Sequence, residues 1–318
     1  MSRFLIWLEP NNGWAASKDL DGIEYNDTGL CNRVLHWEIA YEINRKLNFQ
    51  YNILVEREYW PELDFIDLPN TIALPQCELP RDSMPLSFKK ATSILRNSTN
   101  ISMKDVNWHS NFGYKILASF YGNTNLSHPL SFIKLKDLSI ESYIKESVKD
   151  AIGLHIRRNS GVAFKEEDLD TLLPEIKDRY VRFRKNNPPV EGDYIEYIKD
   201  ELYFSIIDGI LQINPVQKFY ISCDLPYNLY SYYKDKYGDT IITKEDLLAS
   251  IEESSATLSN IVDLFALSFC KFVVKSNRSS WSDFAQFHSS RLAAYVKEPF
   301  EKSIKPKYLN NNRKKNLI

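Results

Sequence analysis

The chain has 318 residues, about twice the length of a typical domain, so we expect two domains of roughly 150 residues each. Hydrophobic residues make up 43% and charged residues 26%, which excludes a disordered chain, a collagen-like fibre and a coiled-coil rod. Forty basic residues against forty-two acidic ones give a net charge of -2, so the chain has no global field to hold a nucleic acid or an anionic membrane. Any anion must be bound locally.

The four cysteines lie far apart and form no C-x-x-C pair, so we expect reduced thiols rather than a zinc site or a disulfide framework. The apolar run at residues 4–8 is too short for a signal-peptide core or a membrane span, and no other run comes near twenty apolar residues. We therefore expect a cytoplasmic protein with no transmembrane segment. The sequence does not predict its oligomeric state.

The first half opens with a predicted strand at residues 4–8, followed by a polar loop and a helix at about residues 32–46. A short strand at residues 51–55 comes next, and residues 57–145 carry no pattern that we can assign. The helix is indicated by apolar residues that recur every four positions: Leu35, Ile39, Ile43 and Leu47.

The second half alternates regularly between strands and helices. The predicted strands are residues 151–156, 218–223 and 272–275, and the predicted helices are residues 194–213, 258–269 and 279–296. This order is typical of an α/β fold with parallel, Rossmann-like sheets, in which ligands bind at the carboxyl ends of the strands. We divide the chain into an N-terminal domain (1–148), a C-terminal domain (149–300) and a basic polar tail (301–318).

Two adjacent arginines, Arg157 and Arg158, follow the most apolar predicted strand. Guanidinium groups bind phosphate oxygens in pairs and keep their charge, which suits a diphosphate. The alternative is that both arginines only mark the point where the strand reaches solvent, paired with the acidic residues 166–168.

A serine-rich segment lies between the last strand and the last helix and contains Ser276, Ser279 and Ser280. The start of a helix offers free N–H groups to an anion, and hydroxyl groups add to them. The spacing of Ser280 and Asp283 also predicts a capping box, so ordinary helix capping in a polar loop is the alternative.

Two weaker signals complete the set. Gly29 precedes the first helix in a loop that ends in Asn32, although the dinucleotide pattern G-x-G-x-x-G is absent. Asp224 ends a predicted strand, where its carboxylate would accept hydrogen bonds from a nucleoside or would cap the turn that follows.

Taken in order, these segments resemble the metal-independent fucosyltransferase superfamily (α1,6-, α1,2- and protein-O-fucosyltransferases). The similarity covers most of the second half and about fifty residues of the first. The matching segments are Thr28-Gly29-Leu30-Cys31-Asn32-Arg33, His155-Ile156-Arg157-Arg158, Phe219-Tyr220-Ile221-Ser222-Cys223-Asp224, and Asp263-Leu264-Phe265 through Ser276 to Ser282.

The resemblance implies an α/β fold of the GT-B kind, with two facing Rossmann-like domains, the nucleotide-sugar donor in the C-terminal domain and the acceptor largely in the N-terminal one. It implies GDP-fucose as donor, a carbohydrate acceptor and no metal cofactor. The donor-site residues it implies are Asn32, His155, Arg157, Arg158, Asp224, Ser276, Ser279 and Ser280. Thr28 and Cys31 depart from the family pattern, which has glycines at these two places, and Asn159 replaces an aspartate.

Fixed positive charge from Arg157 would stabilise the diphosphate as it leaves, and Glu166 or Glu167 would take the proton of the acceptor hydroxyl, giving inversion. The alternative for both glutamates is a solvated helix start. Metal-dependent transferases instead use a D-x-D pair, but residues 19–21 and 168–170, which have this pattern, close no buried strand. A further alternative is a GDP-sugar-binding protein that is catalytically weak, or a transferase that uses another nucleotide sugar.

Overall fold

The computed structural model describes residues 3–7, 17–18, 24–25, 30–75, 78, 80, 82–96, 107–110, 129–157, 162–163, 177, 195–196, 198–223, 229–252, 255–276, 279–289 and 292–295. These residues form a mixed α/β structure with two five-stranded sheets in which every strand pairing is parallel. The predicted α/β class with parallel sheets is therefore confirmed. Within these residues, no helix is long and apolar enough to cross a membrane.

The first sheet has the strand order β6-β4-β1-β8-β7. Its strands are β1 (Phe4–Trp7), β4 (Asn52–Glu56), β6 (Thr71–Leu74), β7 (Ser83–Pro85) and β8 (Asn107–Ser110).

The second sheet has the order β14-β13-β10-β15-β16, which in chain order reads 3-2-1-4-5 and is typical of a doubly wound sheet. The order reverses between β10 and β15, so a crevice outside their carboxyl ends is the expected ligand position. The strands are β10 (Ile152–Ile156), β13 (Phe219–Cys223), β14 (Ile241–Thr243), β15 (Phe272–Lys275) and β16 (Leu292–Tyr295).

Among the described residues there are also three two-stranded pairings and four 3-10 turns. The pairs are β2 (Ser17–Lys18) with β3 (Glu24–Tyr25), β5 (Ile66–Asp67) with β9 (Lys134–Leu135), and β11 (Val162–Ala163) with β12 (Ile195–Glu196). The turns are η1 (Arg57–Tyr59), η2 (Pro61–Asp64), η4 (Pro129–Phe132) and η6 (Gly238–Thr240).

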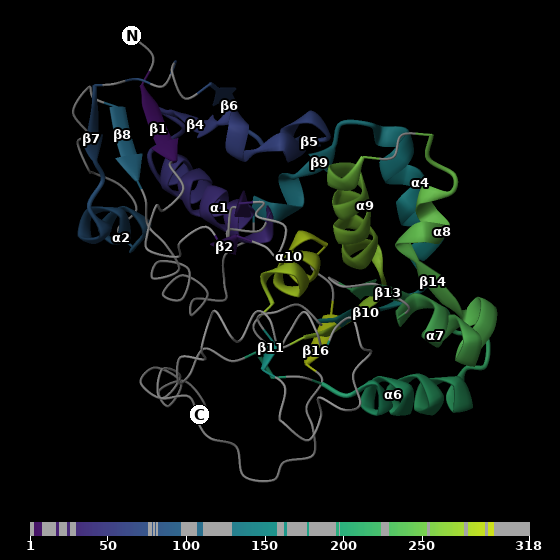
Figure 1. Ribbon diagram of the computed structural model, residues 1–318. Coiled ribbons are helices and arrows are strands. Elements are labelled where there is room, and N and C mark those ends of the chain that lie inside the picture. Colours follow the sequence, from purple (N-terminus) through teal and green to yellow (C-terminus); the bar gives the residue numbers. More distant parts are fainter. Residues whose placement is uncertain are drawn as a thin grey trace, which may run out of the picture.

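In the part of the chain that the structure describes, eight helices cover the sheets. Figure 1 shows two of them, α9 and α10, between the sheets. Helix α9 contacts η2 and α4, and helix α10 contacts α1 and η4. One apolar core runs from the first sheet through both helices to the second sheet. The helices are α1 (Leu30–Lys46), α2 (Phe88–Arg96), α4 (Leu138–Val148), α6 (Asp200–Ile213), α7 (Leu229–Tyr237), α8 (Lys244–Leu248), α9 (Ala256–Phe269) and α10 (Ser280–His288).

His288, the last residue of α10, links the two halves directly. Its Nε2–H donates a hydrogen bond of 2.9 Å to the backbone oxygen of Ile133, and Ser268 Oγ lies 3.1 Å from its Nδ1. Burial lowers the pKa of this imidazole to about 4, so it is neutral at neutral pH and satisfied at both nitrogens.

Alternation along β10 separates the two faces of the second sheet. Ile152, Leu154 and Ile156 belong to a second core under α6 and α7. Gly153, on the opposite face, lies so close to α9 that a Cβ there would be 2.7 Å from Leu267 Cδ1. Glycine therefore permits the close approach of α9 to the strand.

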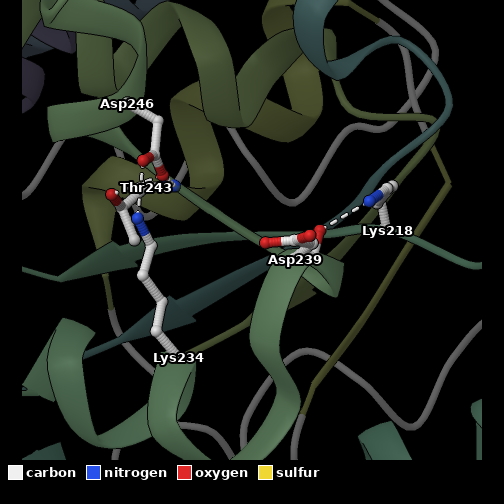
Figure 2. Close-up of polar contacts among 5 residues, drawn as sticks. All are labelled: Lys218, Lys234, Asp239, Thr243 and Asp246. Atoms are coloured by element: carbon white, nitrogen blue, oxygen red, sulfur yellow. Dashed lines mark hydrogen bonds and ion pairs between the residues drawn. The ribbon is translucent and has the colours of Figure 1, made fainter.

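A capping box fixes the corner where β14 meets α8, as Figure 2 shows. The Asp246 carboxylate accepts hydrogen bonds from the backbone N–H and the hydroxyl of Thr243, at 2.8 and 2.9 Å, and also binds Lys234 Nζ at 2.5 Å. Nearby, Lys218 Nζ donates to the backbone oxygen of Asp239 at 2.5 Å. Both lysines are exposed, so these contacts stabilise the corner only modestly.

The predicted strands at residues 4–8, 51–55, 151–156, 218–223 and 272–275 are confirmed with shifts of one residue or none at each end. The helices predicted near residues 32–46 and 258–269 are also confirmed, each starting two residues earlier.

Two predicted helices are wrong in extent. The helix predicted at 194–213 begins only at Asp200, because Ile195–Glu196 pairs with β11, and its buried face consists of Tyr203, Phe204 and Ile207. The helix predicted at 279–296 ends at His288, because Leu292–Tyr295 extends the second sheet beside β15.

Candidate functional site

The candidate site lies where the strand order of the second sheet reverses. Arg157, half-buried, directly follows β10, and Ser276, buried, directly follows β15. The first turn of α10 starts at Ser280, four residues further on. Two of the segments that the sequence singles out, the arginine pair and the serine-rich segment, therefore meet at one edge of one sheet.

Buried polar side chains form a layer at this edge, on the face that α9 and α10 cover. They come from β10, β13 and β15, from α9 and α10, and from the N-cap of α10. The layer consists of His155, Tyr220, Ser222, Lys275, Asp263, Ser279 and Ser282. Ser276 lies on the other face, where its hydroxyl is 3.5 Å from the hydroxyl of Tyr203 in α6.

A hydrogen-bonded chain ties α10 to β13 and α9. Trp281 Nε1 donates to Ser222 Oγ at 3.1 Å, and the Ser222 hydroxyl donates to Asp263 Oδ2 at 2.7 Å. The Tyr220 hydroxyl donates to the other carboxylate oxygen of Asp263, also at 2.7 Å. Burial raises the pKa of Asp263 to about 6, although the two hydroxyl donors oppose this shift.

His155 holds the end of β10 to the loop after β15. Its backbone oxygen accepts hydrogen bonds from Ser276 Oγ at 2.6 Å and from the Tyr203 hydroxyl at 3.2 Å. Burial, and then the charges of Arg157 and Lys275, lower the pKa of its imidazole to about 3, so the ring is neutral. The ring atom Nδ1 is buried and has no hydrogen-bond partner among the described residues.

The start of α10 has an N-cap hydroxyl that does not cap the helix. Ser279 occupies the N-cap position, but within the described residues its hydroxyl caps no N–H group and has no other partner, although the residue is only 2% exposed. Ser282 Oγ instead donates back to the Ser279 carbonyl at 3.2 Å. The helix therefore offers N–H groups and a buried hydroxyl together, which suits an anion.

The predicted capping box of Ser280 and Asp283 is wrong. Ser280 is the first helical residue rather than the cap, and the Asp283 carboxylate binds Lys275 Nζ. Lys275, only 2% exposed, also donates to Gln286 Oε1 at 2.8 Å, so it bridges two side chains one helical turn apart on α10. The pair brings a buried ammonium and a carboxylate, 34% exposed, to the start of the helix.

The beginning of α1 faces the same place from the first half. α1 contacts α10, and, after burial, the charge of Asp283 is the largest cause of the raised pKa of the Cys31 thiol. Arg33 forms a buried ion pair with Glu62 and lies over the Trp60 ring, 5.5 Å from its centroid. The ion pair therefore ties the first turn of α1 to η2.

The structure brings together five of the residues that the sequence predicts for the site: His155, Arg157, Ser276, Ser279 and Ser280. Asn32 is the third residue of α1, and its side chain lies outside the described residues. The remaining predicted site residues, Arg158, Glu166, Glu167 and Asp224, also lie outside them.

The sequence prediction missed the roles of Lys275, Asp283, Ser222 and Trp281. The signal for two of them was present: Ser222 and Lys275 are polar residues near the ends of otherwise apolar strands. Within the described part of the chain, no group of three or more His, Cys, Asp or Glu side chains is placed to hold a metal ion.

No protein-family model matches the chain, and no curated protein sequence matches it. Solved structures do align with it. Fucosyltransferase NodZ from Bradyrhizobium aligns with 11% identity and a TM-score of 0.41 over 90% of this chain and 93% of that one. NodZ alpha-1,6-fucosyltransferase soaked with GDP-fucose aligns with 11% identity and a TM-score of 0.44 over 90% of this chain and 92% of that one. POFUT1 in complex with GDP aligns with 7% identity and a TM-score of 0.45 over 93% of this chain and 98% of that one.

Proposed function

We propose that the chain is a glycosyltransferase that moves fucose from GDP-fucose to a hydroxyl group of a carbohydrate acceptor, with inversion and without a metal ion. The choice of GDP-fucose rests on the ordered motifs of the sequence. The proposal includes a GT-B arrangement in which residues 149–300 bind the donor and residues 1–148 bind most of the acceptor.

One observation carries the proposal. At the carboxyl edge of the second sheet, beside Arg157 and the first turn of α10, two buried polar atoms have no partner among the described residues: His155 Nδ1 and Ser279 Oγ. A buried polar group without a partner costs about 1–3 kcal/mol, so such atoms are expected where a ligand completes them. Arginine and a helix N-terminus together select a phosphate-bearing ligand.

The chemistry follows from where charge develops. As the bond between the sugar and the diphosphate breaks, negative charge grows on the leaving oxygen, and Arg157 with the α10 N–H groups would stabilise it without rearrangement. The neutral His155 ring would hold a diphosphate oxygen or a nucleoside by hydrogen bonding rather than by charge. The acceptor hydroxyl would attack from the opposite side of the sugar and give its proton to a carboxylate, for which Glu166 and Glu167 are our candidates.

Binding of nucleotides tests the donor assignment. Calorimetry should show that GDP and GDP-fucose bind whereas UDP and UDP-sugars do not, and transfer should persist in excess EDTA. Binding of UDP-sugars without GDP-sugars would reject the family assignment, and loss of transfer in EDTA that added Mg²⁺ or Mn²⁺ restores would reject the metal-free reaction.

Arg157→Ala tests the diphosphate contact. We expect donor binding and transfer to fall at least a hundredfold, of the order seen when one charge-stabilising donor is removed, with the thermal unfolding midpoint nearly unchanged. The matched control is Arg57→Ala, which removes an exposed arginine of the first half and its ion pair with Asp64. A folded Arg157 variant with wild-type turnover would remove this residue from the site.

A GDP-sugar-binding protein with little turnover is the second candidate, and one observation favours it. α1 begins at Leu30, so Cys31, Asn32 and Arg33 lie inside the helix, and Arg33 binds Glu62 within the first half. A loop that is already helical approaches a donor less closely than a glycine-rich one. Donor binding with neither hydrolysis nor transfer across a panel of carbohydrate acceptors would select this candidate.

A further inference from the structure

The ion pair of Lys275 and Asp283 places opposite charges at the first turn of α10. Lys275 is the last residue of β15 and is almost fully buried, whereas the Asp283 side chain remains one-third exposed in the first turn of the helix. The charge of Lys275 acts on the same imidazole as the charge of Arg157, which places the ammonium near the buried polar atoms described above.

The carboxylate does not serve the helix as a cap. The backbone N–H of Asp283 already binds the Ser279 carbonyl at 3.1 Å, while its carboxylate binds Lys275. A negative side chain in the first turn competes electrostatically with any anion bound to the N–H groups of that turn. Lys275 therefore raises the positive potential at the first turn of α10, and Asp283 lowers it.

This compensation affects ligands according to their charge. A nucleoside diphosphate sugar carries two negative charges on its diphosphate, whereas the free nucleoside diphosphate gains a terminal phosphate whose second pKa is about 6 and so carries about three at pH 8. A fixed carboxylate near the phosphates repels a ligand that carries three negative charges more than one that carries two.

We propose that Lys275 and Asp283 form a charge-balancing pair that sets the preference of the anion site for a nucleotide-sugar donor over the free nucleoside diphosphate. Lys275 attracts both ligands, and Asp283 weakens the binding of the more highly charged product, which favours its release. The assignment rests on the proposed function for the identity of the two ligands, but the sign of each charge effect rests on the ion pair alone.

Calorimetry at pH 8 with GDP, GDP-fucose and inorganic pyrophosphate tests the pair. Asp283→Asn keeps the hydrogen-bonding shape and should tighten GDP and pyrophosphate roughly three- to tenfold, and GDP-fucose about twofold. Lys275→Met should weaken all three, GDP and pyrophosphate the most. The double variant should return the ratio of the GDP and GDP-fucose affinities close to that of the wild type.

Two variants of exposed ion pairs control for net charge. Lys234→Met removes one positive charge in the pair shown in Figure 2, and Glu146→Gln removes one negative charge in the pair with Lys149 on α4. Both pairs are solvent-exposed, so these changes should leave all three affinities within about twofold. Thermal unfolding confirms that each variant is folded.

The outcomes separate this inference from the proposed function. If both single variants change the ligand affinities in the same direction, or change the GDP and GDP-fucose affinities equally, the pair is purely structural and the inference is overturned. Pyrophosphate binding with the expected opposite signs, in a wild type that binds neither GDP nor GDP-fucose, would reject the proposed function and retain the charge-balancing pair. A wild type that binds none of the three ligands overturns both.

Discussion

The two faces of the second sheet are built from the same strands but from different chemistry. Under α6 and α7, the side chains of β10, β13 and β15 form an apolar core from one end of the strands to the other. Under α9 and α10, the same strands contribute Gly153 and apolar residues at their amino ends and His155, Ser222 and Lys275 toward their carboxyl ends. One face only stabilises the sheet, whereas the other also carries the polar groups of the candidate site.

The difference shows how a parallel strand serves two purposes at once. Because successive side chains point to opposite faces, a strand keeps its buried apolar contacts on one face while it places polar groups on the other. Burying those polar groups is tolerated only where they bind one another, as Ser222 and Asp263 do, or a ligand. The following predictions test whether the two faces separate stability from binding.

The largest expected effect is the pH dependence that Asp263 contributes. Burial raises its pKa from 3.8 to about 6, so between these values the folded chain binds more protons than the unfolded chain. The free energy of unfolding should therefore fall as the pH rises from about 4 to 6, by at most about 3 kcal/mol from this residue.

Comparison of the wild type with Asp263→Asn isolates this contribution. Urea unfolding at several pH values should show that the stability of the wild type relative to the variant declines between pH 4 and 6 and is constant above pH 7. A difference that does not change with pH would show that the buried carboxylate has no raised pKa.

The next effect concerns the close contact of β10 with α9. In Gly153→Ala the new Cβ would lie 2.7 Å from Leu267 Cδ1 and 3.1 Å from Cys270 Sγ, both in buried residues. We expect the free energy of unfolding to fall by about 1–3 kcal/mol, the usual cost of overpacking. Gly209→Ala is the matched control, because nothing lies within 4 Å of a Cβ there and alanine should stabilise α6 by about 0.5–1 kcal/mol.

Apolar runs predicted the strands of the second half because parallel strands are buried on both faces and therefore read as continuous hydrophobic segments. The same rule failed at residues 292–295, where Leu-Ala-Ala-Tyr suits a helix as well as a strand and only pairing with β15 decides. Residues 57–145 resisted prediction because their described strands have only two to four residues, too few to establish a period.

Candidate site residues were predicted from the sequence only where a charged residue or a serine lies shortly after a strongly apolar strand. Arg157 and Ser279 were proposed in this way, whereas Asp283 was assigned to a capping box because helix spacing cannot reveal the competing partner Lys275. The contact between α1 and α10 joins helices from opposite ends of the described chain, which no local pattern predicts.

The smallest effect gives the most direct comparison of the two faces, because Ile221 and Ser222 are neighbours on β13 that point in opposite directions. Ile221→Val should lower the free energy of unfolding by about 1 kcal/mol and leave GDP binding unchanged. Ser222→Ala leaves Trp281 Nε1 and one oxygen of Asp263 without their partner and should cost about 1–2 kcal/mol. It should also weaken GDP binding several-fold, since Trp281 lies in the first turn of α10. Equal effects of both variants on GDP binding, measured by calorimetry, would show that the face under α10 is not specialised for the ligand.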